Sequence, residues 1–155
     1  MENEALVKEV LAKIARLCSR SEQCSPDIRK KIIAEGIEED VAEEMINSLK
    51  EENYLNDERF VKAYVADKFK FNKWGKVKMR YYLRLKGLAD EIILIGLNEI
   101  DPEKYKAVLV KTMKDKAKSV KKKNKFEKMG QVIRFTQNRG FEPELIHRYM
   151  NLAIE

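Results

Sequence analysis

The sequence has few residues that interrupt helices. Its 155 residues include only six glycines and three prolines, whereas charged residues make up 37% and hydrophobic residues 44% of the chain. Glycine and proline are the least favourable residues inside helices, while Lys, Glu and Leu are among the better ones, so this composition favours an all-α fold. The length suits one compact domain or a row of small subdomains.

Long hydrophobic runs are also missing. A membrane-spanning helix needs about 18 or more consecutive apolar residues, and no such run occurs, so we expect no membrane association. The first ten residues, MENEALVKEV, are acidic and lack the apolar segment of a secretory signal. The only cysteines are Cys18 and Cys24, and two thiols in a charged helical chain fit a reducing compartment. We therefore expect a cytoplasmic protein with free thiols.

Residues that carry out catalysis or bind metals are scarce. His147 is the only histidine, and with two cysteines it does not make a convincing zinc site. No Gly-rich phosphate-binding loop and no GxSxG nucleophile motif occurs. Paired acids such as Glu43 and Glu44 are typical of a solvated helix face. We expect no enzyme activity, no metal and no cofactor.

Charge is distributed unevenly along the chain. The formal charge of +6 arises from −6 over residues 1–57, +4 over residues 58–104 and +8 over residues 105–155. A basic half indicates a polyanionic partner such as nucleic acid or a nucleoprotein. The alternative is that the gradient has no functional use, because many helical proteins carry uneven charge.

Three similar segments begin at glycines. GIEEDVAEEMI starts at Gly36, GLADEIILIGL at Gly87 and GFEPELIHRYM at Gly140, with spacings of 51 and 53 residues. Apolar residues recur one, five, six and ten positions after each glycine, which is the pattern of a buried helical stripe. Repetition at this period predicts tandem copies of one supersecondary unit.

Each copy is predicted to contain three helices, and the repeated glycine is predicted to end the second helix in a left-handed conformation. The expected fold is all-α, with three tandem three-helix repeats in an elongated, curved array. The expected repeat boundaries are 1–56, 57–101 and 102–155. The expected helices are 3–19, 26–35 and 38–52, then 58–71, 74–86 and 89–99, then 102–122, 126–139 and 143–153.

The third copy is longer than the second. From the first aromatic residue to the glycine there are 27 residues between Phe60 and Gly87, but 35 between Tyr105 and Gly140. The eight extra residues fall around the segment AKSVKKKNKFEK. They either lengthen the first helix or add a basic loop.

Two groups of basic residues are candidates for contacting phosphates. One follows the second helix of the middle copy, where residues three or four apart share a side. The other lies in the insertion between Lys116 and Lys128, for which a solvated charged segment is the alternative. Phosphate contacts would give sequence-independent, salt-sensitive affinity for single- and double-stranded DNA. The candidate binding residues are Lys73, Trp74, Lys76, Arg80, Arg84, Lys121, Lys122, Lys123 and Lys125.

Aromatic residues alternate with lysines in KFKFNKWGK, residues 68–76. Aromatic residues at helical spacing are usually buried, so we interpret them as packing residues rather than as platforms for stacking bases. We expect Phe71 to face the core. The spacing does not assign Phe69, and for Trp74 both a buried and a partly exposed position stay open.

Three motifs resemble a known family. YLNDERFVKAYV (residues 54–65) and WGKVKMRYYLRLKG (residues 74–87) are similar to motifs of the RecX family of bacterial recombinase regulators. RFTQNRGFEPELI (residues 134–146) looks like that family's closing segment. Val61 stands where a small alanine is common, and the basic insertion is longer than usual. The resemblance covers nearly the whole chain.

The resemblance implies a regulatory protein without a catalytic site, built of tandem three-helix units. It implies binding to the RecA–DNA filament, in its helical groove, where such proteins restrain ATP hydrolysis, strand exchange and support of repressor cleavage. The family supplies no set of functional residues to transfer, so the candidate residues rest on spacing alone. We expect a monomer. The alternatives are a non-specific DNA- or RNA-binding module that acts without RecA, and a helical scaffold for another protein.

Overall fold

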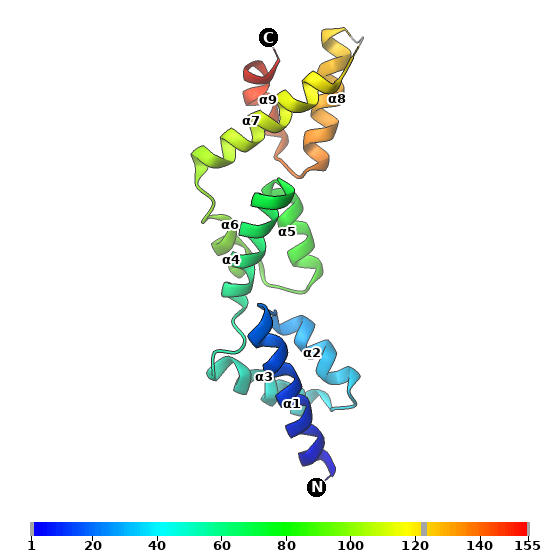
Figure 1. Cartoon of the computed structure of the whole chain (residues 1–155), viewed down its shortest axis with the longest axis vertical. Helices are drawn as coiled ribbons and strands as arrows, with labels where there is room; N and C mark the ends of the chain where they lie inside the picture. The colour runs from blue at the N-terminus through cyan, green and yellow to red at the C-terminus, as the bar shows by residue number, and fades with distance from the viewer. Residues whose placement is uncertain (1, 122–123, 155) are drawn as a thin grey trace.

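The computed structural model describes residues 2–121 and 124–154, and these residues form helices and connecting loops without a strand (Figure 1). The first unit contains α1 (Glu2–Arg20), α2 (Ser25–Ala34) and α3 (Glu39–Glu51). The middle unit contains α4 (Asp57–Asp67), the π-helical turn η1 (Lys68–Asn72), α5 (Lys76–Leu85) and α6 (Asp90–Leu97). The third unit contains α7 (Pro102–Ser119), α8 (Lys125–Asn138) and α9 (Pro143–Ala153). The predicted all-α class and the tandem three-helix repeats are confirmed.

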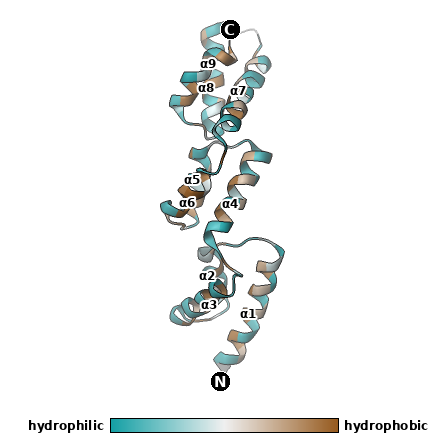
Figure 2. Ribbon diagram, turned by 90° about the vertical axis from the view of Figure 1, so that its left-hand side faces the viewer, coloured by the Kyte–Doolittle hydropathy of each residue, from teal (hydrophilic) through white to brown (hydrophobic). Residues whose placement is uncertain are grey.

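The units are stacked along one long axis. The first unit lies at one end and the third at the other, so the molecule is elongated (Figure 1). Within the units α2 packs on α3, α6 packs on α4 and α5, and α7 packs on α8 and α9. Most helices carry both hydrophilic and hydrophobic residues in Figure 2, as expected for amphipathic helices that bury one face.

The repeated glycines end the second helix of each unit as predicted. Gly36, Gly87 and Gly140 have φ values of +95°, +97° and +97°. This left-handed conformation is costly for residues with a Cβ atom, which explains why glycine recurs at this point of each repeat.

The buried apolar residues form two clusters. The first unit has its own cluster, which includes Ile28, Ile32 and Leu49. A second cluster runs through the middle and third units without interruption and joins Leu83 to Phe141. The middle and third units therefore share one core. The boundaries at 1–56, 57–101 and 102–155 remain our proposal.

Polar contacts and one buried thiol connect the first unit to the middle unit. The backbone N–H of Ser25, the first residue of α2, donates to the Asp57 carboxylate at 2.7 Å. The Lys86 ammonium pairs with Asp27 at 2.8 Å. Cys24 is fully buried and belongs to the core of the other two units. Its burial raises its pKa to about 11.

The Asp27–Lys86 pair changes the titration of both groups. Burial acts to raise the pKa of Asp27, but hydrogen bonds from Lys86 and Cys24 and the Lys86 charge outweigh it, so the pKa of Asp27 lies below its usual value. The pKa of Lys86 is raised, chiefly by its hydrogen bond to Asp27. Both groups are therefore charged at neutral pH.

The structure corrects the expectation for Phe71. The first helix of the middle unit ends at Asp67 and continues as the π-helical turn η1 rather than as an α-helix to residue 71. A π-helical turn closes over i to i+5, so it rotates the following side chains relative to α-helical spacing. Phe71 is 71% exposed and does not face the core. Phe69 instead packs against the core, with its ring stacked on Tyr105.

The eight extra residues of the third unit contribute to more than one element. Compared with α4 and η1 together, α7 is longer, and the loop after it is longer than the one before α5. The largest part lengthens α8, which begins 15 residues before Gly140, whereas α5 begins 11 residues before Gly87. Over residues 2–121 and 124–154, no helix has the length and apolarity to cross a membrane.

Candidate nucleic-acid interface

The start of α5 is covered by the third unit. The first N–H groups of a helix lack intrahelical partners. Gly75 N–H donates to the Arg139 carbonyl at 2.7 Å, and Lys76 N–H donates to the Tyr105 hydroxyl at 2.9 Å. The third unit therefore caps α5, just as Asp57 of the middle unit caps α2.

The two backbones at this junction approach closely because both contact residues are glycines. A Cβ atom on Gly75 would lie 2.3 Å from the Gly140 carbonyl oxygen, and one on Gly140 would lie 2.2 Å from the Lys78 Cβ. Val77 N–H donates to the Gly140 carbonyl at 2.9 Å. No larger residue fits at either glycine without moving the middle and third units apart.

Tyr105 connects the junction to a neighbouring lysine. Its hydroxyl donates to the Glu142 carboxylate, and burial together with this hydrogen bond raises the pKa of Tyr105. The Lys76 ammonium lies 4.9 Å from the centre of the Tyr105 ring. Lys76, a candidate binding residue, therefore packs at the junction and is only partly exposed.

Basic residues of the middle and third units meet in a pocket of about 320 Å³ beside this junction. We call it the junction pocket; it is lined by Lys73, Thr112, Asp115, Lys116, Ser119, Phe135 and Arg139. The Lys116 ammonium and the Arg139 guanidinium each lie 4.9 Å from the centre of the Phe135 ring. Asp115, the acid in the pocket, pairs with Lys111 at 3.1 Å.

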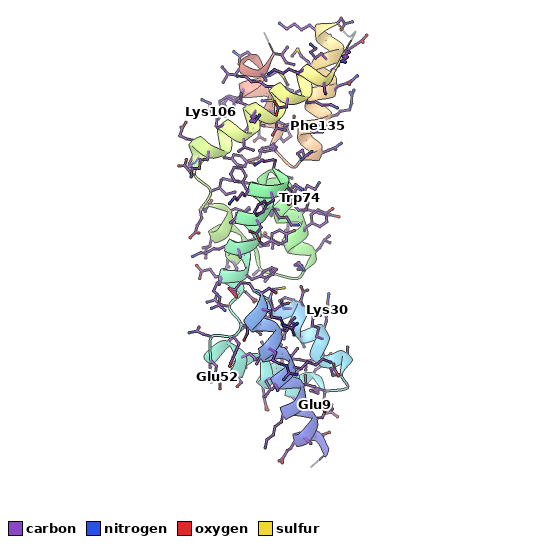
Figure 3. All side chains as sticks on the ribbon, viewed as in Figure 1. Glu9, Lys30, Glu52, Trp74, Lys106 and Phe135 are labelled. Carbon is purple, nitrogen blue, oxygen red and sulfur yellow. The ribbon has the colours of Figure 1, made fainter. Side chains whose placement is uncertain are left out.

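This arrangement can bind a phosphate backbone. Lys116 and Arg139 flank the Phe135 ring, and Lys73 lines the same pocket. Cationic grooves with aromatic residues are a common means of binding single strands. Lys73 reaches the pocket from a left-handed residue, φ 56°, that precedes α5 rather than from the helix itself. Trp74 and Phe135 lie on the middle-unit and third-unit sides of the junction (Figure 3).

Trp74 is partly buried and packs on its neighbours. Its ring is stacked with Tyr82 at 5.3 Å between centres. The ammonium groups of Lys68 and Lys78 lie 4.8 Å and 4.6 Å from the indole centre. These cation–π contacts hold positive charge at the surface beside the ring. The structure therefore gives Trp74 a packing role and leaves part of it accessible.

Arg80 and Arg84 lie apart from the junction pocket and are both paired. Arg80 donates to both Asp90 carboxylate oxygens, at 3.3 Å and 3.0 Å, and Arg84 lies 3.5 Å from Asp90. The hydrogen bond from Arg80 and the charges of both arginines hold the pKa of Asp90 below its usual value. Of the predicted stripe, Lys76, Arg80 and Arg84 lie four residues apart on α5, whereas Lys73 precedes the helix.

Of the remaining candidates, two are described, near the end of α7 and at the start of α8. Lys121 and Lys125 are exposed, while Lys122 and Lys123 lie outside the described residues. Sequence reasoning missed Arg139 and Phe135 of the junction pocket. One signal for Arg139 exists: it precedes a repeated glycine, as does Lys86, which contacts the first unit.

We searched the described residues, 2–121 and 124–154, for clusters of metal-binding side chains. No group of three or more His, Cys, Asp or Glu residues is placed to hold an ion there. The interface is therefore described by its lysines, arginines and aromatic rings alone.

Together these features define an all-helical tandem-repeat protein with a basic interface between its last two units. The family model described as RecX, second three-helix domain, matches residues 56–96. The crystal structure of RecX from Lactobacillus salivarius superposes with a TM-score of 0.89 at 17% identity, covering 97% of both chains. A second crystal structure of a regulatory protein RecX gives a TM-score of 0.84, also at 17% identity, over 94% of this chain and 72% of that one. These structures show the same fold.

Curated relatives agree with the family model. Regulatory protein RecX of Clostridium perfringens strain 13 is 30% identical over 129 residues, which cover 82% of this chain and 60% of the relative. Regulatory protein RecX of Caldanaerobacter subterraneus is 27% identical over 146 residues, covering 94% of this chain and 71% of the relative. Over most of its length, the chain is therefore similar to proteins of the RecX family. It spans about 60% of the length of the C. perfringens relatives that it matches.

Proposed function

We propose that the chain binds the filament that RecA forms on DNA and lowers RecA's ATP hydrolysis, strand exchange and support of repressor cleavage. It acts as a monomer in the bacterial cytoplasm and has no catalytic activity of its own. The observation that carries the proposal is the similarity to RecX proteins, whose curated relatives are named regulatory proteins.

Shape and charge support this function. An elongated row of units offers a long face that can follow the groove of a filament. The junction pocket and the lysines of the third unit supply contacts to DNA phosphates. The first unit, with a formal charge of −5 over residues 1–56, helps to orient the chain against basic patches of the filament protein.

The test is an ATPase titration on preformed RecA filaments, with sedimentation to measure how much of the chain stays bound. We expect DNA-dependent ATP hydrolysis to fall at substoichiometric to equal ratios of chain to RecA. Unchanged hydrolysis at saturating, bound chain would contradict the proposal.

The second candidate function is non-specific binding of DNA or RNA without RecA, which the junction pocket favours. A comparison of naked and RecA-coated single strands at physiological salt separates the two. Tighter binding to naked strands supports the second candidate, whereas tighter binding to coated strands supports the first.

A further inference from the structure

An exposed apolar stripe runs along α5. Val77, Tyr81 and Leu85 are 51%, 58% and 62% exposed, and we call these three residues the α5 stripe. Four-residue spacing places them on one side of the helix. Together with Arg80 and Arg84 they line a shallow hollow of about 450 Å³. Grouped exposed apolar side chains of this kind mark interaction sites more often than isolated ones do.

The other two units show that the repeat does not require this stripe. Counted back from the repeated glycine, the positions of Tyr81 and Leu85 are occupied in the first unit by Lys30 and Ala34. In the third unit they are occupied by Arg134 and Asn138. All four of these residues are exposed, and only Ala34 is apolar. The repeat fold therefore does not need large apolar side chains at these positions. Lys30, which occupies the position of Tyr81 in the first unit, is labelled in Figure 3.

The chemistry of the α5 stripe fits a protein better than DNA. Asp90 offsets one of the two arginine charges beside the stripe, which weakens its attraction for phosphates. Aliphatic side chains such as Leu85 offer bases no aromatic face for stacking. Tyrosine and arginine next to aliphatic residues are instead the composition of protein interfaces.

We propose that the α5 stripe docks on a protein surface that presents apolar side chains bordered by carboxylates. Arg84, whose side chain is 60% exposed and 3.5 Å from Asp90, supplies the charge that such a border would meet. The inference rests on the proposed function: the stripe contacts the protein of the filament, while the junction pocket contacts its DNA. The α5 stripe lies on the middle unit, which also contributes Lys73 to the junction pocket, so one chain can use both surfaces.

The test transfers the residues of the first unit to the middle unit. The double variant Tyr81→Lys, Leu85→Ala carries side chains that the same repeat position already tolerates. It removes apolar surface and adds a positive charge, so it affects protein and DNA partners in opposite directions. The matched control is Lys30→Ala, at the position in the first unit that corresponds to Tyr81.

Binding is measured to RecA-coated and to naked single strands. We expect the double variant to bind coated strands about tenfold or more weakly, since truncated interface anchors have effects of that size, and to bind naked strands equally or more tightly. Lys30→Ala should leave binding to coated strands unchanged. Circular dichroism checks the fold, and Val77→Thr, a change that conserves volume, provides a second variant with a smaller loss in the same direction.

Three results would overturn the inference. Equal binding of variant and wild type to coated strands would mean that the stripe does not dock there. A parallel loss on naked strands would mean that it contacts DNA. If the wild type itself fails to bind coated strands, the proposed function fails as well, and this outcome is distinct from the other two.

Discussion

Gly36 and Gly140 have the same backbone conformation in different surroundings. Their φ values are +95° and +97°. A Cβ atom on Gly36 would meet no atom within 4 Å, whereas one on Gly140 would collide with Lys78. Comparing substitutions at these two glycines therefore separates two free-energy costs of adding a Cβ atom: that of the left-handed backbone and that of the close contact between units.

Replacing each of these glycines by alanine should give different losses of stability. Gly36→Ala should lower the free energy of unfolding by about 1 kcal/mol, the cost of a left-handed residue with a Cβ atom. Gly140→Ala should lower it by about 1–3 kcal/mol more, as overpacking does in other cores. Urea denaturation measures both losses, and equal losses would show that the glycine contact is not tight in solution.

Cys24 should make stability depend on pH in the alkaline range. Its folded pKa of about 11 exceeds the unfolded value of about 8.5, so the folded state favours the thiol. The stability from this preference is complete below the unfolded pKa and is lost as the pH rises from about 8.5 to about 11. We expect Cys24→Ala to reduce the loss of unfolding free energy over this range; an identical pH profile would contradict the assignment.

Lys116 should contribute to the salt dependence of DNA binding. Lys116 and Arg139 both contact the Phe135 ring, but Arg139 also donates to the Asn72 carbonyl of the middle unit. Replacing Lys116 therefore tests the effect of its charge without breaking this bond between units. Lys116→Gln should lower the slope of log affinity against log salt by about 1. Lys114→Gln, at an exposed residue of the same helix that does not line the pocket, is the matched control. Equal slopes for the two variants would exclude a phosphate contact at Lys116.

At the residue scale, the sequence identified basic residues near the junction pocket but did not predict where their side chains lie. Spacing placed Lys73 on a helical stripe with Arg84, but the left-handed Lys73 lies before α5 and reaches the junction pocket instead. Phe71 was assigned to the core on α-helical spacing, which the π-helical turn invalidates. Arg139 and Phe135 could not be assigned because their proximity to Lys73 depends on how two units pack.

At the scale of elements, the second helices of the first two units lack caps of their own. Neither Cys24 before α2 nor Gly75 before α5 provides a side-chain cap. In each case the next unit supplies the acceptor, a carboxylate at Asp57 and a hydroxyl at Tyr105. Helix bounds were predictable from periodicity and glycines, but this capping between units was not, because the acceptors are distant in sequence.

Removing the hydroxyl of Tyr105 tests this capping. Tyr105→Phe leaves the Lys76 N–H without its acceptor and Glu142 without a donor, which should lower the free energy of unfolding by about 1–3 kcal/mol. Tyr54→Phe, at an exposed tyrosine of the first unit, should change it by less than about 0.5 kcal/mol. Thermal and urea unfolding report the difference, and similar values for both variants would mean that the cap contributes little.

At the scale of the whole molecule, the two apolar clusters predict two cooperative regions. The middle and third units share a core, whereas the first unit is joined to them mainly by polar contacts and Cys24. Hydrogen exchange at increasing urea should show the amides of α1 and α3 opening before those of α4 and α7. Lys86→Met should widen this separation, and simultaneous exchange of all units would indicate a single cooperative region.

The repeat period predicted how many units there are and how each folds, but not how their cores merge. The apolar stripe after each glycine indicates the number of units and the fold of each. Only the packed structure shows that Leu83 and Phe141 belong to one cluster. Local periodicity reports which face of a helix is buried. It does not report whether that face is shared with the next unit.

The start of α8 differs from the starts of α2 and α5. The starts of α2 and α5 are each covered by a following unit, but α8 begins one turn earlier relative to its glycine. Asn124 caps that start itself by accepting from Glu127 N–H at 2.8 Å. The third unit therefore caps the start of its own second helix, whereas in the first and middle units the next unit supplies that cap.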